Sequence, residues 1–76
     1  MENTFEPGDK VCYIPPYDKA PYENGVVKSL SNDKNYAFVV FKCGDDWENY
    51  QDYTASRTNI KRLEKGWYNK YTDEIK

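Results

Sequence analysis

Strand-favouring residues form their longest run at positions 35–43, and the polar residues around this run indicate where it begins and ends. Between residues 36 and 41, aromatic and aliphatic side chains fall on both faces of an extended segment, because neighbours in a strand point to opposite sides. A strand that is apolar on both faces is normally interior to a sheet. The run is too short for a typical helix and lies between turn-like residues at 32–35 and 43–46. We therefore predict an interior strand here.

Shorter apolar runs predict further strands on either side of the interior one. These predicted strands are residues 10–14, 26–30 and 53–58. The first of them ends at Pro15 and Pro16, because proline cannot donate to a strand ladder. Asn24 and Gly25 mark a tight turn or the start of the second. Residues 59–63 are predicted to form a short helical turn that leads into a last strand or docking segment.

The remaining segments divide the chain into an arm, a main domain and a tail. Residues 1–6 are predicted to form a polar N-terminal arm, and residues 7–67 to form the folded domain. Residues 68–76 are predicted to be a C-terminal tail or a short helix, because apolar residues recur near this end at helical spacing. No second domain is expected.

A chain of 76 residues makes one small domain with a modest core, in which eight Tyr, three Phe and two Trp must supply much of the buried area. We predict an all-β fold, a small barrel of about five strands. Residues 44–53 are predicted to cover it as a short helical or loop lid. Asp45 and Glu48 have the spacing of a capping box, which favours a helical turn over a loop in this segment.

Composition gives little support for catalysis or for a bound metal. The chain has no His, its Ser residues lie in no nucleophile motif, and its Gly residues are too scattered to cradle a phosphate, so neither enzyme activity nor a cofactor is predicted. The acidic residues within 45–52 lack the spacing and the Gly of a calcium loop, so no metal site is predicted. Cys12 and Cys43 lack metal-ligand spacing and are expected to be reduced, while their distance from each other stays open.

Charge and hydropathy argue against a strongly basic nucleic-acid-binding protein and against a membrane-spanning one. Eleven Lys and Arg against thirteen Asp and Glu give a net charge of −2, which argues against a strongly basic nucleic-acid footprint. The first residues are polar, and no apolar run approaches membrane-spanning length. We therefore expect a cytoplasmic protein without a membrane segment.

Two groups of residues are candidates for contact with a partner. Aromatic residues provide large and rigid contact area, and those predicted to bind an unidentified protein partner are Tyr17, Tyr22, Trp47, Tyr50 and Tyr53. Packing of these rings over one end of the barrel is the alternative. A local basic stretch beside aromatic residues makes nucleic-acid binding possible through Arg57, Lys61, Arg62 and Lys65. For this second group, charges on a solvated face are the alternative.

The order of short motifs adds a resemblance. The stretches PGDKV, ENGVV and YAFVVF, followed by the Asn-Ile pair before Leu63, resemble the SH3-like small barrels of the KOW and Tudor type. More narrowly, GDKVCYIPPY, ENGVVKSL, FVVFKCGDDWENYQDYT and RTNIKRLEKGW together resemble uncharacterised small proteins of gut bacteria and their phages. This resemblance implies an SH3-like barrel. Our functional hypothesis is a non-catalytic protein-interaction module, a phage or mobile-element accessory that docks on a host protein, with a nucleic-acid-binding KOW-type domain as the alternative.

Overall fold

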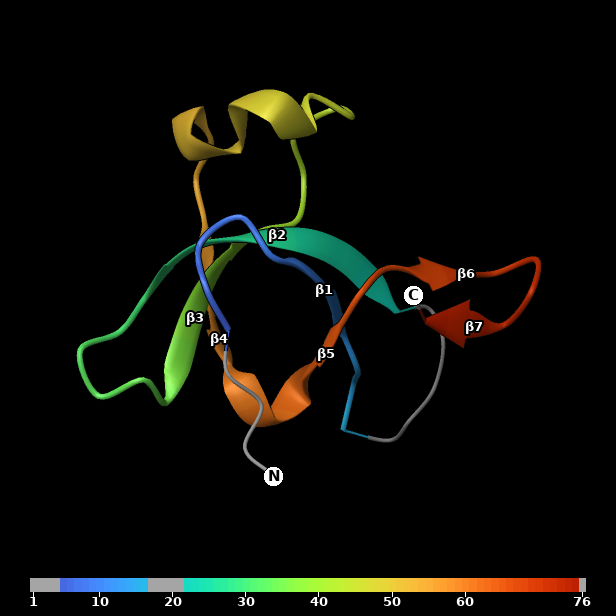
Figure 1. Cartoon of the computed structure of the whole chain (residues 1–76), viewed down its shortest axis with the longest axis horizontal. Helices are drawn as coiled ribbons and strands as arrows, with labels where there is room; N and C mark the ends of the chain where they lie inside the picture. The colour runs from blue at the N-terminus through green and yellow to red at the C-terminus, as the bar shows by residue number, and fades with distance from the viewer. Residues whose placement is uncertain (1–4, 17–21, 76) are drawn as a thin grey trace.

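A curled antiparallel sheet forms the centre of the computed structural model, which describes residues 5–16 and 22–75 (Figure 1). The strand order is β4-β3-β2-β1-β5, and the strands are β1 (Lys10–Tyr13), β2 (Glu23–Leu30), β3 (Tyr36–Val40), β4 (Ser56–Asn59) and β5 (Leu63–Lys65). Two 3-10 turns and a small hairpin complete the described chain: η1 (Trp47–Asp52), η2 (Ile60–Arg62), and the pair β6 (Tyr68–Asn69) and β7 (Glu74–Ile75). The regular structure is thus nearly all strand, which confirms the predicted all-β class.

β3 is the interior strand that the sequence predicts. It pairs with β2 along one edge and with β4 along the other. Its residues Ala37 and Val39 are fully buried and pack in the core with Val11 of β1 and Val27 of β2. Phe5, which belongs to the predicted N-terminal arm, is buried in the same core. A ring of this size adds a large share of buried apolar area to so small a core.

The sheet curls but does not close into the predicted barrel. β4 and β5 are its two edge strands and do not pair with each other. η2 joins them, and Asn59 caps this turn by accepting a hydrogen bond from the N–H of Lys61 on its Oδ1 (2.9 Å). The chain then enters β5, which pairs with β1. On the two sides of η2, β4 therefore pairs with β3 and β5 pairs with β1. One edge of β4 stays unpaired among the described residues.

β2 begins at Glu23, so of the two predictions for Asn24 and Gly25, a tight turn or the start of the second strand, the structure has the start of the strand. Gly25 is needed there because the backbone of β2 comes very close to β3. A Cβ at this position would lie 2.6 Å from Cγ1 of Val39. Glycine in a strand interior often marks such a close approach.

A bulge in β2 directs Lys28 toward the segment that follows β3. The pairing register with β3 shifts between Val27 and Ser29, which leaves Lys28 as the extra residue. Its Nζ donates a hydrogen bond of 2.8 Å to the backbone carbonyl of Tyr53. β2 thereby holds the end of the predicted lid.

The lid, residues 44–53, contains η1 and stands above β2 at the top of Figure 1. The predicted capping box is wrong, because Asp46 is the residue that precedes η1, its side chain makes no capping bond, and Asp45 has a φ of 66°. Asp46 accepts hydrogen bonds from Nδ2 of Asn49 (2.9 Å) and from the hydroxyl of Tyr53 (2.8 Å). The lid is therefore closed on itself by side chains.

The C-terminal residues form a hairpin, where the sequence predicts a tail or a short helix. The side chain of Asn24 fixes it to β2, because its Oδ1 accepts from the N–H of Tyr68 (2.8 Å) and its Nδ2 donates to the carbonyl of Tyr68 (3.0 Å). The N–H of Asp73 donates to the carbonyl of Asn69 (2.8 Å) and closes the turn. The hairpin projects from the sheet at the right of Figure 1.

Candidate binding surface

The aromatic residues predicted to contact a partner lie on different parts of the molecule. Tyr17 lies outside the described residues. The ring of Tyr22 packs edge-on against Tyr68 of the C-terminal hairpin, with 4.7 Å between ring centroids. The ring of Trp47, in the lid, lies 5.0 Å from that of Trp67. Two of the five predicted contact residues therefore pack against the C-terminal part of the chain.

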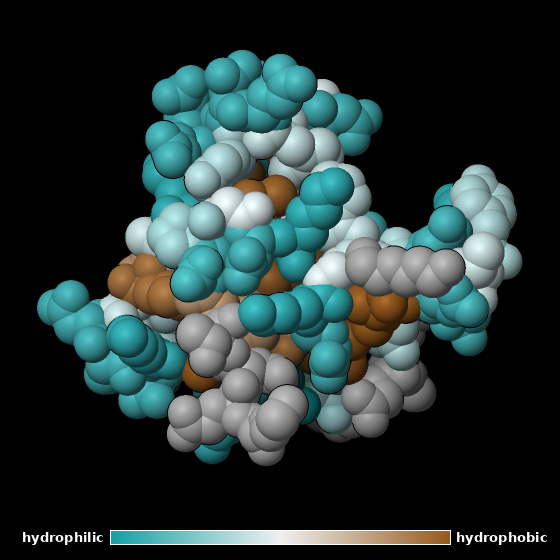
Figure 2. Space-filling view, viewed as in Figure 1, coloured by the Kyte–Doolittle hydropathy of each residue, from teal (hydrophilic) through white to brown (hydrophobic). Residues whose placement is uncertain are grey.

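The lid aromatics combine packing with partial exposure. Trp47, Tyr50 and Tyr53 are all half-buried. A Cβ built on Gly8 would lie 3.4 Å from the hydroxyl of Tyr50, so the lid approaches the turn before β1. Figure 2 shows a mostly hydrophilic lid above apolar patches that hydrophilic side chains interrupt. This partial burial agrees with lid packing and leaves part of each ring accessible to solvent.

The bond between Tyr53 and Asp46 makes the stability of the protein depend on pH. The hydrogen bond to Asp46 raises the pKa of Tyr53, and partial desolvation and the carboxylate charge raise it further. A group whose pKa is raised on folding contributes stability below its unfolded value, about 10 for Tyr, and the contribution is lost as pH rises through the folded value. We expect Tyr53→Phe to flatten the loss of stability above about pH 10. Urea unfolding of both proteins at increasing pH measures this. Equal losses in the two proteins would contradict the assignment.

The four predicted nucleic-acid contacts separate into a group and a single residue. Arg57 lies on β4, and Lys61 and Arg62 lie in η2, which follows β4 directly. Lys65 lies on β5 at the other edge of the sheet, with its Nζ 3.9 Å from Oδ2 of Asp9. The structure thus brings three of the four together.

Arg57 and Arg62 line an open pocket of about 350 Å³, here named the inner pocket. Two aromatic rings lie in its wall, Tyr13 and Phe41, in edge-on contact with 6.3 Å between centroids. Its lining residues are Tyr13, Glu23, Phe41, Ser56, Arg57, Thr58, Asn59 and Arg62. Aromatic and arginine side chains are the types that most often dominate protein interfaces.

Antiparallel pairing explains why these residues meet. Tyr13 ends β1, Glu23 begins β2, Phe41 follows β3 and Ser56 begins β4, so all four lie at the same end of the sheet. Sequence reasoning missed Tyr13 and Phe41 as site residues. Their alternation within strand-like runs assigned them to a strand, but nothing local indicates that these strand ends converge.

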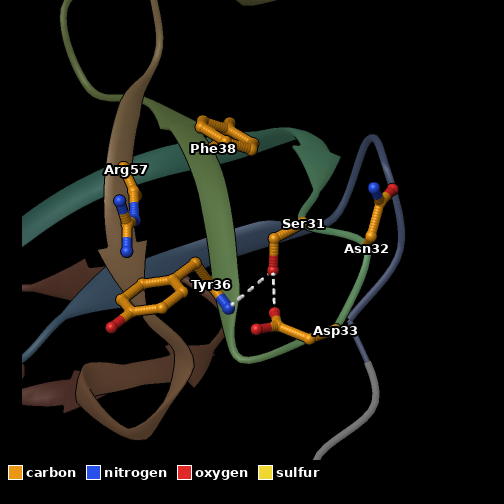
Figure 3. Close-up of a pocket in the computed structure, with 6 residues that line it drawn as sticks. All are labelled: Ser31, Asn32, Asp33, Tyr36, Phe38 and Arg57. Carbon is orange, nitrogen blue, oxygen red and sulfur yellow. Dashed lines mark hydrogen bonds between the residues drawn. The ribbon is translucent and has the colours of Figure 1, made fainter.

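A second pocket, the outer pocket, lies on the opposite face of β3 and β4 and has a volume of about 310 Å³ (Figure 3). The guanidinium carbon of Arg57 lies 4.0 Å from the ring centroid of Tyr36. The hydroxyl of Ser31 donates to Oδ1 of Asp33 (2.7 Å) and accepts from the N–H of Tyr36 (3.1 Å). The lining residues are Ser31, Asn32, Asp33, Tyr36, Phe38 and Arg57. Arg57 therefore lines both pockets.

Charged side chains of both signs line the pockets, but the arginines form no salt bridge with a described residue, whereas the Asp33 carboxylate accepts hydrogen bonds. Among the described residues, neither Arg57 nor Arg62 is in a salt bridge. The carboxylate of Asp33 is already bound, and the hydrogen bonds from the Ser31 hydroxyl and the Asn35 N–H lower the pKa of Asp33. Glu23 is the other carboxylate in the lining. An anionic group in the inner pocket would meet Arg62 and one carboxylate, whereas the guanidinium of Arg57 lies over Tyr36 in the outer pocket.

The cysteines line neither pocket and are not bonded to each other. Cys12 is fully buried and Cys43 is nearly so, and both carry free thiols. Burial raises the pKa of the Cys12 thiol, with a smaller opposing effect from the N–H of Tyr68. A buried thiol with a raised pKa is a poor nucleophile. Cys12 therefore packs in the structure as a small apolar side chain.

The candidate surface is defined by geometry, and the chain has no matching known protein from which residue roles would follow. No helix among the described residues is long and apolar enough to cross a membrane. Comparisons of this chain with models of known families, with curated proteins and with solved structures find no match.

Proposed function

We propose that the protein is a non-catalytic binding module that holds a segment of another protein against the inner and outer pockets. The observation that carries this proposal is the inner pocket. There, Arg62 lies in the same lining as the rings of Tyr13 and Phe41, and Arg57 borders both this pocket and the outer one. Neither arginine forms a salt bridge with a described residue. Such a cluster supplies both buried area and directed hydrogen bonds to a partner.

The charges favour an acidic partner segment. Two arginines line the inner pocket and Lys61 is exposed beside them in η2, although the whole chain has a net charge of −2. Opposite charge across an interface fixes its register and speeds encounter.

An SH3-like assignment and the resemblance to phage proteins belong to the same proposal. The meander of β1 to β4, the 3-10 turn η2 and the return of β5 to pair with β1 support an SH3-like assignment. In this proposal, the module is an accessory of a phage or mobile element, and its partner is a host protein in the cytoplasm.

Nucleic-acid binding is the second candidate, and the position of an arginine beside aromatic rings in each pocket favours it. Bases stack on aromatic rings, and arginines neutralise phosphates. The position of Lys65 beside Asp9 at the other edge of the sheet removes one of the four basic residues from this surface. Nucleic-acid binding would weaken steeply with salt, whereas binding through an aromatic protein interface would weaken little.

The test is capture of a partner from host lysate on the immobilised protein, with and without nuclease, followed by mass spectrometry. After nuclease treatment, the double variant Arg57→Glu/Arg62→Glu is expected to capture at least about 10-fold less of the protein partner than the wild type does, because hot-spot residues are lost. Lys42→Glu/Lys70→Glu is the matched control, because it makes the same charge change at exposed residues that line neither pocket.

The control variant is expected to retain the partner as the wild type does. Loss of the partner on nuclease treatment would favour the nucleic-acid alternative. Equal retention by the two double variants would show that the pockets are not the contact surface. Circular dichroism of each variant establishes that the sheet is intact.

A further inference from the structure

β4 is an edge strand whose backbone is available to a partner. The N–H of Ile60 donates to the carbonyl of Asn35 (3.2 Å), while the carbonyl of Tyr36 accepts from the N–H of Ser31 (2.9 Å). Residues 35, 37 and 39 therefore direct their backbone groups to β4, and residues 36 and 38 direct theirs to β2. This alternation decides which groups of β4 point away from the sheet.

Arg57 is a residue of β4 whose main-chain N–H and C=O face away from β3. Thr58 and Ser56 lie opposite Ala37 and Val39, so their N–H and C=O groups point to β3. The N–H and C=O of Arg57 consequently point to the free edge. No described residue pairs with this edge. An unpaired edge of this kind is a template for another strand.

The two pockets lie on either side of this same edge. The inner pocket includes Ser56 and Thr58, which share the core-facing side of β4, and the outer pocket includes Tyr36 and Phe38 on the opposite side of β3. Arg57 lines both pockets. Side chains of a strand alternate between the two faces of a sheet. A strand added to β4 would therefore direct successive side chains into the two pockets in turn.

β4 has pockets beside its free edge, and the other edge strand, β5, does not border either of them. On β5 itself, the basic residue Lys65 has its Nζ 3.9 Å from Oδ2 of Asp9. Neither of the two pockets includes a residue of β5. The features that would recognise side chains of an added strand are therefore found beside β4.

Charge identifies the occupant. Arg57, Lys61 and Arg62 lie within six positions of each other and are all exposed. A second copy of this chain that paired through its own β4 would bring Arg57 near Arg57 of the other copy, and facing like charges destabilise a strand pair. An acidic strand from another protein would meet opposite charge at the same positions.

We propose that β4 binds an extended segment of the partner, in which acidic residues alternate with apolar ones, as an additional strand of the sheet. This inference rests on the proposed function and specifies its partner class. Main-chain hydrogen bonds to Arg57 hold the segment, and the two pockets select its side chains.

The test uses the full chain with a capped synthetic peptide in which Val and Glu alternate. A Val-Lys peptide of the same length controls for charge. Two further Val-Glu peptides are N-methylated at every second residue, one along each edge, so that both keep all side chains but each loses the N–H groups of one edge. Binding is measured by titration calorimetry, and amide hydrogen exchange is measured at Arg57.

We expect the Val-Glu peptide to bind at least about 10-fold more tightly than the Val-Lys peptide, and one N-methylated isomer to lose at least about 10-fold in affinity while the other keeps it. Only one edge of the peptide can pair with β4, which is why the isomers differ. Exchange of the Arg57 amide is expected to slow at saturating Val-Glu peptide, whereas the amide of Lys70, in the C-terminal hairpin, keeps its rate.

Absence of binding, equal affinity of the two isomers, or an unprotected Arg57 amide would overturn strand addition. These outcomes are distinct from failure of the proposed function. A captured protein partner that still depends on Arg57 and Arg62 would then support binding through side chains alone. A partner that is indifferent to both arginines would overturn the two proposals together.

Discussion

Gly25→Ala is expected to destabilise the protein by about 3 kcal/mol, the upper part of the range for overpacking a well-packed site. The added Cβ would lie 2.6 Å from Cγ1 of Val39, 2.8 Å from the carbonyl oxygen of Val40 and 2.9 Å from Cδ1 of Phe41. A side-chain atom can rotate away, but the carbonyl belongs to the β2–β3 pairing and moves only with the strand. For 76 residues, a total stability of about 4–11 kcal/mol is typical, so this loss is large. Urea unfolding monitored by fluorescence measures it.

Gly44→Ala is the matched control for this prediction. Gly44 has a φ of 61°, and nothing lies within 4 Å of the position of its Cβ. Its substitution is expected to cost only about 1–2 kcal/mol, the ordinary penalty of an L-residue in the left-handed region. A Gly25→Ala protein that is as stable as Gly44→Ala would show that β2 and β3 do not approach each other as closely as described.

Trp67→Ala is expected to cost about 3 kcal/mol, the lower end of the range for aromatic truncations, because the ring is half-buried. The indole connects three parts of the chain. Its Nε1–H donates to the carbonyl of Gly25 (2.8 Å), its ring lies 5.0 Å from that of Trp47, and Nζ of Lys10 lies 4.6 Å from its centroid. Loss of the ring therefore loosens the lid and the C-terminal hairpin at once. Thermal and urea unfolding give the change in stability.

Two further variants separate the contributions of this indole. Trp67→Phe keeps a ring and removes the N–H, and is expected to cost about 1 kcal/mol for the lost hydrogen bond. A double-mutant cycle of Trp67→Ala with Trp47→Ala is expected to give a coupling of about 1 kcal/mol, as is usual for aromatic pairs. Strictly additive losses would mean that Trp47 does not pack against Trp67, and would favour the interpretation of Trp47 as free contact surface.

The lid aromatics illustrate how far a residue type can indicate function. Tyr and Trp are common both in interfaces and in the walls of small cores, so the sequence leaves both roles open for Trp47 and Tyr53. The bond from Tyr53 to Asp46 and the contact of Trp47 with Trp67 show that these rings pack within the protein. The part of each ring that stays exposed to solvent depends on the folded surface, and the residues next to it in the sequence do not indicate it.

The inner pocket also combines residues that the sequence singles out with residues that it does not. Arg57 and Arg62 stand out in the sequence because basic residues gather between 57 and 65. Tyr13 and Phe41 do not stand out, since each belongs to an apolar strand-like run. They join the arginines only because antiparallel pairing brings the end of β1 and the end of β3 to the same end of the sheet.

The sequence by itself determined the all-β class, the interior position of β3 and the helical turn at η2. These depend on side-chain alternation and turn chemistry, which act between near neighbours. Tertiary structure alone decided that Asn24 and Gly25 belong to a strand, that the C-terminal residues form a hairpin, and that the sheet stays open beside β4. Each of these rests on contacts between residues far apart in the chain, such as the bonds of Asn24 with Tyr68 and of Trp67 with Gly25. Contacts of that kind leave no periodic trace in the sequence, so only the folded chain reveals them.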